Sequence, residues 1–331
     1  MPSRRDLCKL LLIGGVASVL PRAFAVTATS TPTPKVKALK ITILSTMLAD
    51  EGFGEWGFSA LVEADGHRIL YDTGAHPDIV LKNAKALGIT LSDIHELVLS
   101  HNHDDHSGGL IALRTELMQT NPDALGVAHV GRGIFVPRID EKGKDDNGTT
   151  PIRAAYEKLG GRWIQHDKPT QLQPGVWLTG PVPRPNSERN WSGHRRLADE
   201  KTGALGAEDT VPEDSALVFD TEKGLVILTG CGHAGIVNIA QYARATVRRA
   251  PLEAIIGGLH LFNANDETIA WTAAQLKPME VRHLLGAHCT GIEATYRLRD
   301  GLGLSRKTAT VAAVGSFYDL GDGLHPGELA G

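Results

Sequence analysis

The six residues from His101 to His106 constrain this chain more than any other segment, because they place four potential metal ligands within one short stretch. They follow the apolar run Leu97–Leu99 and precede Gly108, an order that predicts a strand end, a turn and a helix start. Imidazoles two residues apart at a strand end can face one ion, and a carboxylate and a third imidazole from the turn can reach a second ion. Imidazoles and a carboxylate at this spacing favour zinc as the metal. The alternative to a metal site is a polar loop that is merely rich in histidine.

Three more histidines stand at the ends of other predicted strands. His233, His260 and His288 each follow a short apolar run and have glycine, alanine or cysteine as neighbours. Ligand sites in α/β sheets form at strand ends. One such histidine alone would more often be a buried, hydrogen-bonded residue, but three at separate strand ends are hard to explain by packing. Together with the first motif they complete a set of ligands for two ions.

The apolar pattern predicts strands and helices in both halves of the chain. Strands are expected at 39–44, 58–64, 68–71, 97–99, 126–130, 175–179, 215–219, 225–228, 254–256 and 282–285, and helices at 77–87, 107–120, 152–159, 234–249 and 267–276. Hairpins and strand–helix units in each half favour a layered α/β protein with two sheets and outer helices. Residues 131–214 are polar and poor in periodicity, so we interpret them as a loop-rich insertion or lid.

The first residues predict export. Arg4-Arg5, the apolar run 10–20 and Ala23-Phe24-Ala25 form a twin-arginine signal peptide over residues 1–25, with cleavage expected after Ala25. The expected partner is the twin-arginine export machinery, and the expected location is the periplasm or the medium. The apolar run is too short to span a bilayer as a stable helix, and Cys8 precedes it, so we expect no stable membrane anchor.

A Thr/Pro-rich tether is expected over residues 26–37, ahead of a domain over 38–331. The chain has a net charge of −4, and removing the signal, which carries +3, leaves about −7. This charge argues against nucleic acid as a partner. Cys231 and Cys289 each lie near a histidine, which favours roles at the site, although two cysteines also allow a disulfide. The oligomeric state is left open.

The chain resembles the metallo-β-lactamase fold superfamily from Leu39 to Leu320, through Asp72, the histidine-rich motif and His288. More narrowly, it resembles the subgroup of 7,8-dihydropterin-6-methyl-4-(β-D-ribofuranosyl)-aminobenzene-5′-phosphate synthase-like proteins. The segments that carry this second resemblance are Trp56–Ser59, Thr179–Arg184, Thr229–Gly235, Gly257–Leu261 and His288–Gly291. The resemblance implies a four-layer αββα sandwich, in which 131–214 is the insertion.

The resemblance also implies two zinc ions per chain, with iron or manganese as alternatives. One ion would be held by His101, His103 and a third group, and the other by Asp105, His106 and His288. Many relatives supply the third group as a histidine upstream of Ser215, where this chain has Glu213 and Asp214, so we expect His233 instead.

Other residues have expected roles around the ions. Cys231 stands where relatives place a bridging aspartate or a metal-binding cysteine, so it either binds metal or contacts a ligand. Asp72 is expected to orient a ligating histidine. His260 is a candidate proton donor, or a residue that orients a ligand by hydrogen bonding. Trp56 and Arg184 are candidates for substrate contacts.

The expected function is that of an exported hydrolase that uses two metal ions to activate water against a small ester, lactone, amide or phosphodiester. Asp105 and His260 would be its catalytic residues. Relatives with di-iron redox chemistry commonly have a carboxylate where His103 stands, so its imidazole favours hydrolysis. One alternative is a pterin-related synthase, which fits poorly with export. Another is a non-catalytic metal- or ligand-binding protein, against which the full ligand set argues.

Overall fold

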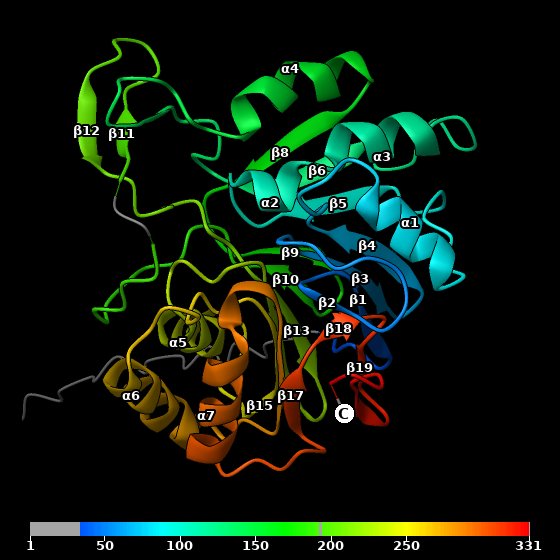
Figure 1. The fold of residues 1–331 in the computed structure, drawn as a ribbon, viewed down its shortest axis with the longest axis vertical. Helices are drawn as coiled ribbons and strands as arrows, with labels where there is room; N and C mark the ends of the chain where they lie inside the picture. Colours follow the sequence, from blue (N-terminus) through cyan, green and yellow to red (C-terminus); the bar gives the residue numbers. More distant parts are fainter. Residues whose placement is uncertain (1–33, 192–193, 331) are drawn as a thin grey trace, which may run out of the picture. The chain divides into compact units, whose positions relative to one another are not determined.

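Two large β-sheets form the centre of the computed structural model, which describes residues 34–191 and 194–330 (Figure 1). The first sheet has the strand order β20-β19-β1-β3-β4-β5-β6-β8. In this order the strands are Gly323–His325, Phe317–Asp319, Leu39–Ser45, Ser59–Ala64, His67–Tyr71, Glu96–Leu99, Val127–Gly131 and Arg162–His166. The predicted signal peptide lies outside the described residues.

The second sheet has the strand order β17-β16-β15-β14-β13-β10-β9. In this order the strands are Ala309–Val311, His283–Gly286, Leu252–Gly257, Gly224–Thr229, Leu217–Thr221, Val176–Leu178 and Thr170–Gln173. A small sheet joins β12 (Leu205–Glu208), β11 (Arg196–Ala198) and β7 (Arg138–Ile139), and β18 (Ala313–Val314) pairs with β2 (Leu48–Ala49).

Successive side chains along the strands point to opposite faces of each sheet and form three apolar layers. One layer lies between the two sheets, and the other two lie between each sheet and its helices. In the first sheet Ala60 and Val62 pack between the sheets, whereas Leu61 packs toward helices. In the second sheet Val226 packs between the sheets, and Ile227 packs on the opposite side. A strand whose successive side chains are both buried must have a packed layer on each face. Both sheets are therefore interior layers.

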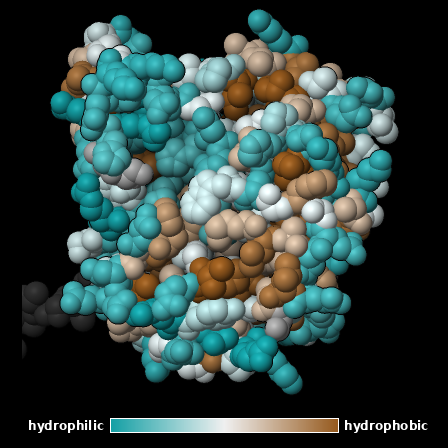
Figure 2. Space-filling model, in the orientation of Figure 1, coloured by the Kyte–Doolittle hydropathy of each residue, from teal (hydrophilic) through white to brown (hydrophobic). Residues whose placement is uncertain are grey.

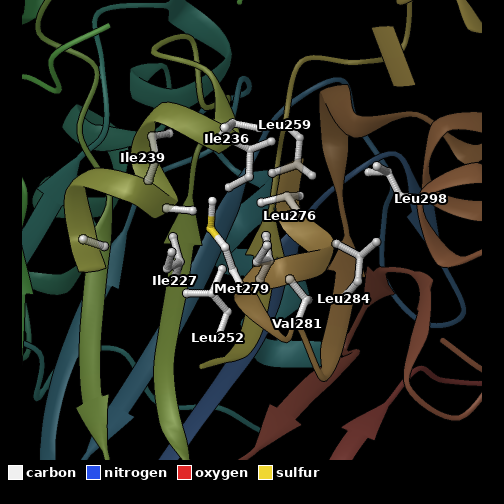
Figure 3. Packing of buried hydrophobic residues seen from close by; sticks show 14 of the residues in the cluster. Ile227, Ile236, Ile239, Leu252, Leu259, Leu276, Met279, Val281, Leu284 and Leu298 are labelled. Carbon is white, nitrogen blue, oxygen red and sulfur yellow. The ribbon is translucent and has the colours of Figure 1, made fainter. Parts of the chain in front are cut away.

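Helices supply the two outer layers (Figure 1). The first sheet is covered by α1 (Ile79–Ala86), α3 (Leu110–Leu117) and α4 (Thr149–Lys158), near the short α2 (Asp104–Ser107). The second is covered by α5 (Ile236–Thr246), α6 (Asp266–Leu276) and α7 (Ile292–Leu302), with single 3₁₀ turns η1 (Lys277–Met279) and η2 (His288–Thr290). Figure 3 shows Ile236 and Ile239 of α5 and Leu276 of α6 packed over Ile227 and Leu284 of the sheet. The four-layer αββα sandwich is confirmed.

The segment 131–214 differs from the expected insertion. It supplies β8 to the edge of the first sheet and β9 and β10 to the second, while α4 covers the first sheet. Only part of the segment lies outside the two large sheets. This part consists of the small sheet of β7, β11 and β12 and the loops beside it. Hydrophilic residues dominate the surface over β11 and β12, at the upper left of Figure 2. Only this smaller part has the polar character that the whole segment was expected to have.

Two other boundaries also differ. Val36, expected in the tether, is buried between the sheets, and its N–H donates to the main-chain oxygen of Asp220 at 2.8 Å. The helix expected at 107–120 begins at Asp104 and is divided into α2 and α3 at Gly108-Gly109. A Cβ at Gly108 would lie 2.0 Å from the main-chain oxygen of Ala75, so glycine there allows a close approach of two chain segments.

The sheet topology places the ends of many strands at one edge of the sandwich. Strands β4, β5 and β6 are parallel in the first sheet, and β14, β15 and β16 are parallel in the second. The Tyr71 hydroxyl at the end of β4 donates to the main-chain oxygen of Ser215 at 2.9 Å, which holds the two sheets together near this edge. In the described part of the chain, we find no helix with the length and apolarity to cross a membrane.

Candidate metal centre

The metal-ligand candidates meet where the strands of both sheets end. His101 and His103 follow β5, and Asp105 and His106 lie in α2, all on the side of the first sheet. His233 follows β14 on the side of the second sheet. His288 follows β16 in η2, and its main-chain N–H donates to the Thr46 hydroxyl at 2.9 Å. The side chains of His101, His106, His233 and His288 are buried.

Two of the four groups of ligand atoms that lie within 4.8 Å of one another in the described residues are those that the sequence suggests. The first group is His101, His103 and His233, and the second is Asp105, His106 and His288. In the second group, His288 Nε2 lies 3.2 Å and His106 Nε2 3.9 Å from the Asp105 carboxylate oxygens. The structure thus brings together the two sets that the sequence suggests, and the ions that they would bind stay a prediction.

Asp72 and Ser100 determine which nitrogen of two of these imidazoles faces the site. The Asp72 carboxylate accepts hydrogen bonds from the Ser100 N–H and hydroxyl and from His106 Nδ1, each at 2.7 Å. Because the Ser100 hydroxyl donates to Asp72, it accepts from His101 Nδ1 at 2.8 Å. Both rings are left with Nε2 pointing at the other ligands, which is the arrangement that metal-binding histidines need. Asp72 is thus placed to orient both rings, and its role toward bound metal stays a prediction.

The remaining imidazoles have the open nitrogens that a metal site requires. His233 Nδ1 donates to the main-chain oxygen of Asn190, so its Nε2 carries a lone pair. Among the described residues, His233 Nε2 and His288 Nδ1 are buried and have no hydrogen-bond partner. Buried polar atoms are normally paired, because leaving them unpaired costs about 1–3 kcal/mol each. A bound cation would satisfy them, so these residues fit a metal centre.

The charge distribution also suits metal ions. Burial and the neighbouring imidazoles lower the pKa of His101 and of His233 well below the usual value, and burial lowers the pKa of His103 to about 3. These rings are therefore neutral ligands at pH 7. Burial opposes protonation of His106, but Asp105 and Asp72 outweigh it and raise its pKa to about 9. The second group therefore favours positive charge, whether from a proton or from a metal ion.

Three non-glycine residues at these strand ends have left-handed backbone conformations. Asp72, His260 and His288 have φ angles of 55°, 49° and 46°. Such conformations cost roughly 1–3 kcal/mol each when the residue has a Cβ, and they cluster at functional sites. Here each one turns the chain sharply after β4, β15 or β16, which directs the side chain toward the centre.

A cavity of about 870 Å³ opens over the ligands. Its walls include His103, Asp105 and His260, together with Trp56 and Phe262. The Trp56 ring centroid lies 4.9 Å from that of His288 and 5.2 Å from that of Phe262. Trp56 is 47% exposed, so a large apolar surface faces the cavity beside the metal ligands. Trp56 therefore lies on the cavity wall, and its expected contact with substrate stays a prediction.

Arg184 lies elsewhere. Its guanidinium donates to the main-chain oxygen of Val211 at 2.9 Å and lies over the Trp191 ring, and it is not part of the cavity wall. The cavity instead has Arg189 and Arg195, which the sequence did not single out. Both lie in a loop whose sequence has no regular apolar period, so the sequence does not indicate whether their side chains point toward the cavity or toward solvent. Arg195 pairs with Asp146 at 2.7 Å on the opposite wall.

His129 and His166 form a separate pair. His129 Nδ1 lies 3.0 Å from His166 Nε2, and both side chains are buried between neighbouring strands β6 and β8. This pair is separate from the two ligand groups.

Comparison with known proteins agrees with this geometry. The family model described as the metallo-beta-lactamase superfamily matches residues 57–119, which include the histidine-rich motif. The chain is 30% identical over 283 residues to a protein of Methanocaldococcus jannaschii named 7,8-dihydropterin-6-methyl-4-(beta-D-ribofuranosyl)-aminobenzene-5′-phosphate synthase, covering 78% of this chain and 90% of that protein. An uncharacterised protein of the same organism is 28% identical over 251 residues, covering 74% and 88%.

Solved structures show the same fold. A crystal structure described as a metal-dependent hydrolase of the beta-lactamase superfamily has a TM-score of 0.66 and 24% identity, covering 84% of this chain and 98% of that one. Zinc-bound PqqB from Methylobacterium extorquens has a TM-score of 0.51 and 15% identity, covering 85% and 100%. The chain therefore belongs to the metallo-β-lactamase superfamily, in the group of proteins related to the archaeal synthase.

Proposed function

We propose that this protein is a dinuclear metal-dependent hydrolase of a small ester, lactone, amide or phosphodiester. The observation that supports this most directly is the pair of ligand groups, His101/His103/His233 and Asp105/His106/His288, beside one cavity. Zinc suits the donor set, with iron or manganese as alternatives, because five of the six ligands are imidazoles. Metal ions held there would activate a water molecule and polarise the carbonyl or phosphoryl group of the substrate.

The residues of the chain have distinct parts in this reaction. Although burial favours the neutral form of Asp105, His106 and His288 hold its pKa below the ordinary value, so Asp105 is ionised at neutral pH. Its carboxylate lines the cavity and can accept a proton from the attacking water. His260 lines the same cavity, where its imidazole can donate a proton to the leaving group. Asp72 and Ser100 orient His106 and His101 throughout.

The test combines metal analysis with activity. Purified protein should contain at least two metal ions per chain and hydrolyse at least one member of a panel of esters, lactones, amides and phosphodiesters. His101→Ala and His288→Ala should each lose metal and turnover. The matched control is His67→Ala, which removes an exposed imidazole at the start of β4. A metal content well below one per chain, unchanged in both variants, would contradict the proposal, and metal without turnover would indicate a binding protein.

The proposed site of action is outside the cytoplasm. Arg4-Arg5, the apolar run and the Ala23-Phe24-Ala25 segment support export by the twin-arginine machinery, with cleavage after Ala25. That machinery carries folded proteins, so the metal could be bound before the protein crosses the membrane. Expression of the full chain in a bacterium with this pathway should give a periplasmic or secreted form that begins at residue 26. N-terminal sequencing that finds Met1 intact on exported protein would contradict the proposal.

A second candidate is the synthase activity in the name of the archaeal relative, and the 30% identity over most of both chains favours it. The same centre would then bind a pterin pyrophosphate and a ribosyl-aminobenzene phosphate. Incubating the metal-loaded protein with both compounds distinguishes the candidates. Formation of the condensed product would establish the synthase, and its absence together with hydrolysis of a panel compound would remove it.

A further inference from the structure

Beside the two ligand groups lies a third cluster of potential metal ligands, formed by Cys231, His260 and Cys289. Their sulfur and nitrogen ligand atoms all lie within 4.8 Å of one another. Each residue follows a different strand of the parallel set β14, β15 and β16, so the fold itself brings the three together. Both thiols are free and buried, at 2% and 1% exposure.

The backbone around this cluster is held in place before any ligand binds. The N–H groups of Leu261 and Phe262, directly after His260, both donate to the main-chain oxygen of Cys289, at 3.0 and 3.1 Å. A Cβ on Gly258 would lie 2.8 Å from Cys289 Sγ and 2.1 Å from the main-chain oxygen of Gly230. Because residue 258 is a glycine, the Cys289 thiol and the main chain at Gly230 can both lie close to it. A rigid cluster of this kind loses little conformational freedom on binding.

One ring nitrogen of the cluster lacks a hydrogen-bond partner, and the ring that carries it reaches the cavity. Within the described residues, His260 Nδ1 is buried without a hydrogen-bond partner, and His260 has a left-handed backbone. The same side chain lines the cavity, so the cluster has a route to solvent for a small ion. Cys231 Sγ lies 3.1 Å from His106 Nε2, so its sulfur is also adjacent to the second ligand group.

We propose that Cys231, His260 and Cys289 form a third metal site, which binds a borderline or soft cation such as Zn²⁺ through two sulfurs and one imidazole nitrogen. Thiolate and imidazole together select such ions over Mg²⁺ or Ca²⁺, which prefer oxygen ligands. Tetrahedral sites of two cysteines and one histidine with an open fourth position are chemically sound for zinc. The Cys231 thiolate would connect this site to the neighbouring group. The inference does not depend on which reaction the protein catalyses, but with this ion bound His260 serves as a ligand, and it can donate a proton to the leaving group only while the third site is empty.

Cobalt is the probe, because thiolate-bound Co²⁺ has a charge-transfer absorption in the near ultraviolet that imidazole and carboxylate ligands do not give. The chain has three cysteines, so Cys8→Ser in every protein leaves Cys231 and Cys289 as the sole thiols. Reduced, metal-free protein is titrated with Co²⁺. The parent should bind three equivalents and show the thiolate band. Cys289→Ala should bind two and lose about half of the band, because Cys231 remains next to His106.

His260→Gln is the second variant, since it keeps both thiols and tests the cluster if Cys289→Ala does not fold. It should weaken the third equivalent at least tenfold and leave the other two bound. Circular dichroism checks the fold of each protein, and thiol titration in denaturant checks that both sulfurs are reduced. Two equivalents in the parent, with a band that Cys289→Ala leaves unchanged, would overturn the third site and show Cys231 acting alone. That outcome would leave the dinuclear hydrolase intact.

Discussion

At the residue scale, the centre depends on side chains that do not themselves face the cavity. Asp72 accepts three hydrogen bonds at 2.7 Å, and through them it sets the orientation of His106 directly and of His101 by way of Ser100. Gly230 is part of the same arrangement, because a Cβ there would lie 2.6 Å from Asp72 Oδ2. The orientation of these two imidazole rings is thus set by buried hydrogen bonds to Asp72 and Ser100.

Asp72→Asn tests this network. The amide keeps the size of the carboxylate but removes its charge and one acceptor, so His106 loses its preferred orientation and a neighbouring negative charge. We expect affinity for the metal at the second group to fall roughly 10–100-fold, with the fold retained. Competition with a chromophoric chelator measures this. Asp93→Asn, at an exposed partner of Arg68, is the control and should leave affinity unchanged.

At the element scale, the sequence predicted the strands that are continuous apolar runs and missed elements without such a run. The strands next to the histidine motif were found because both of their faces are packed, so that successive residues are all apolar. Strand β8 was missed because Arg162–His166 is a half-buried sheet edge without an apolar period. Helix α7 was missed because the face that it buries consists of Ala294, Thr295 and Leu298, while its Ile292 is exposed.

The site was predicted in the same uneven way. Ligands at strand ends could be found, since a short apolar run followed by histidine and small residues is a local pattern. The walls of the cavity could not. Arg189 and Arg195 lie in a loop whose path depends on distant partners, namely Glu208 at 2.6 Å and Asp146 at 2.7 Å. No local pattern indicates which of the many polar residues in that segment face the cavity.

A buried arginine of β7 holds the small sheet of β7, β11 and β12, which the sequence did not predict. Arg138 of β7 is fully buried and pairs with Glu213, also fully buried, and its Nε lies 3.5 Å from Asp209. Arg138→Met would leave both carboxylates buried without their cation. We expect a loss of about 3–5 kcal/mol in unfolding free energy, measured by urea denaturation. Arg132→Met, at an exposed pair with Asp167, should change it by less than about 1 kcal/mol.

Glu188 gives the N-terminal end of α5 a pH dependence. Its carboxylate accepts hydrogen bonds from the N–H groups of Val237 and Asn238, yet burial outweighs them and raises its pKa to about 7. The folded state therefore binds this proton more tightly than the unfolded state. Its contribution to stability should fall as pH rises from about 4.5 to about 7, by up to about 3 kcal/mol, and then level off. Glu188→Gln should remove this part of the pH dependence measured by urea denaturation, and leave the part due to Glu213 and Asp214, whose pKa values burial raises to about 7 and about 6.

At the scale of the whole molecule, both metal groups combine residues from the two sheets. His101 and His103 come from the first sheet and His233 from the second, and the second group has the same division. A bound ion would therefore connect the halves of the sandwich. Ligands that bind the native state alone stabilise it by RT ln(1 + [L]/Kd), which is about 2.7 kcal/mol at a hundredfold excess over Kd.

Removing metal should accordingly lower the stability of the entire fold. We expect a chelator to reduce the melting temperature of the metal-loaded protein in one cooperative transition, and added Zn²⁺ to restore it. Calorimetry with and without the chelator measures the change. The double variant His101→Ala/His288→Ala should show a much smaller difference between the two conditions, because only the cluster of Cys231, His260 and Cys289 keeps all its ligands. A parent protein that is indifferent to the chelator would show that the ions do not connect the sheets.

The pairing of β1 with β19 means that the first sheet cannot be completed early in the synthesis of the chain. Strand β1 lies between β3 and β19, and β19 and β20 are the last strands of the chain. Until residues 317–325 have left the ribosome, β1 has an unpaired edge, although it is among the first segments made. The domain cannot close its first sheet on a partial chain. A chain that lacks residues 317–325 would thus present β1 as an open strand edge, to which another chain could pair.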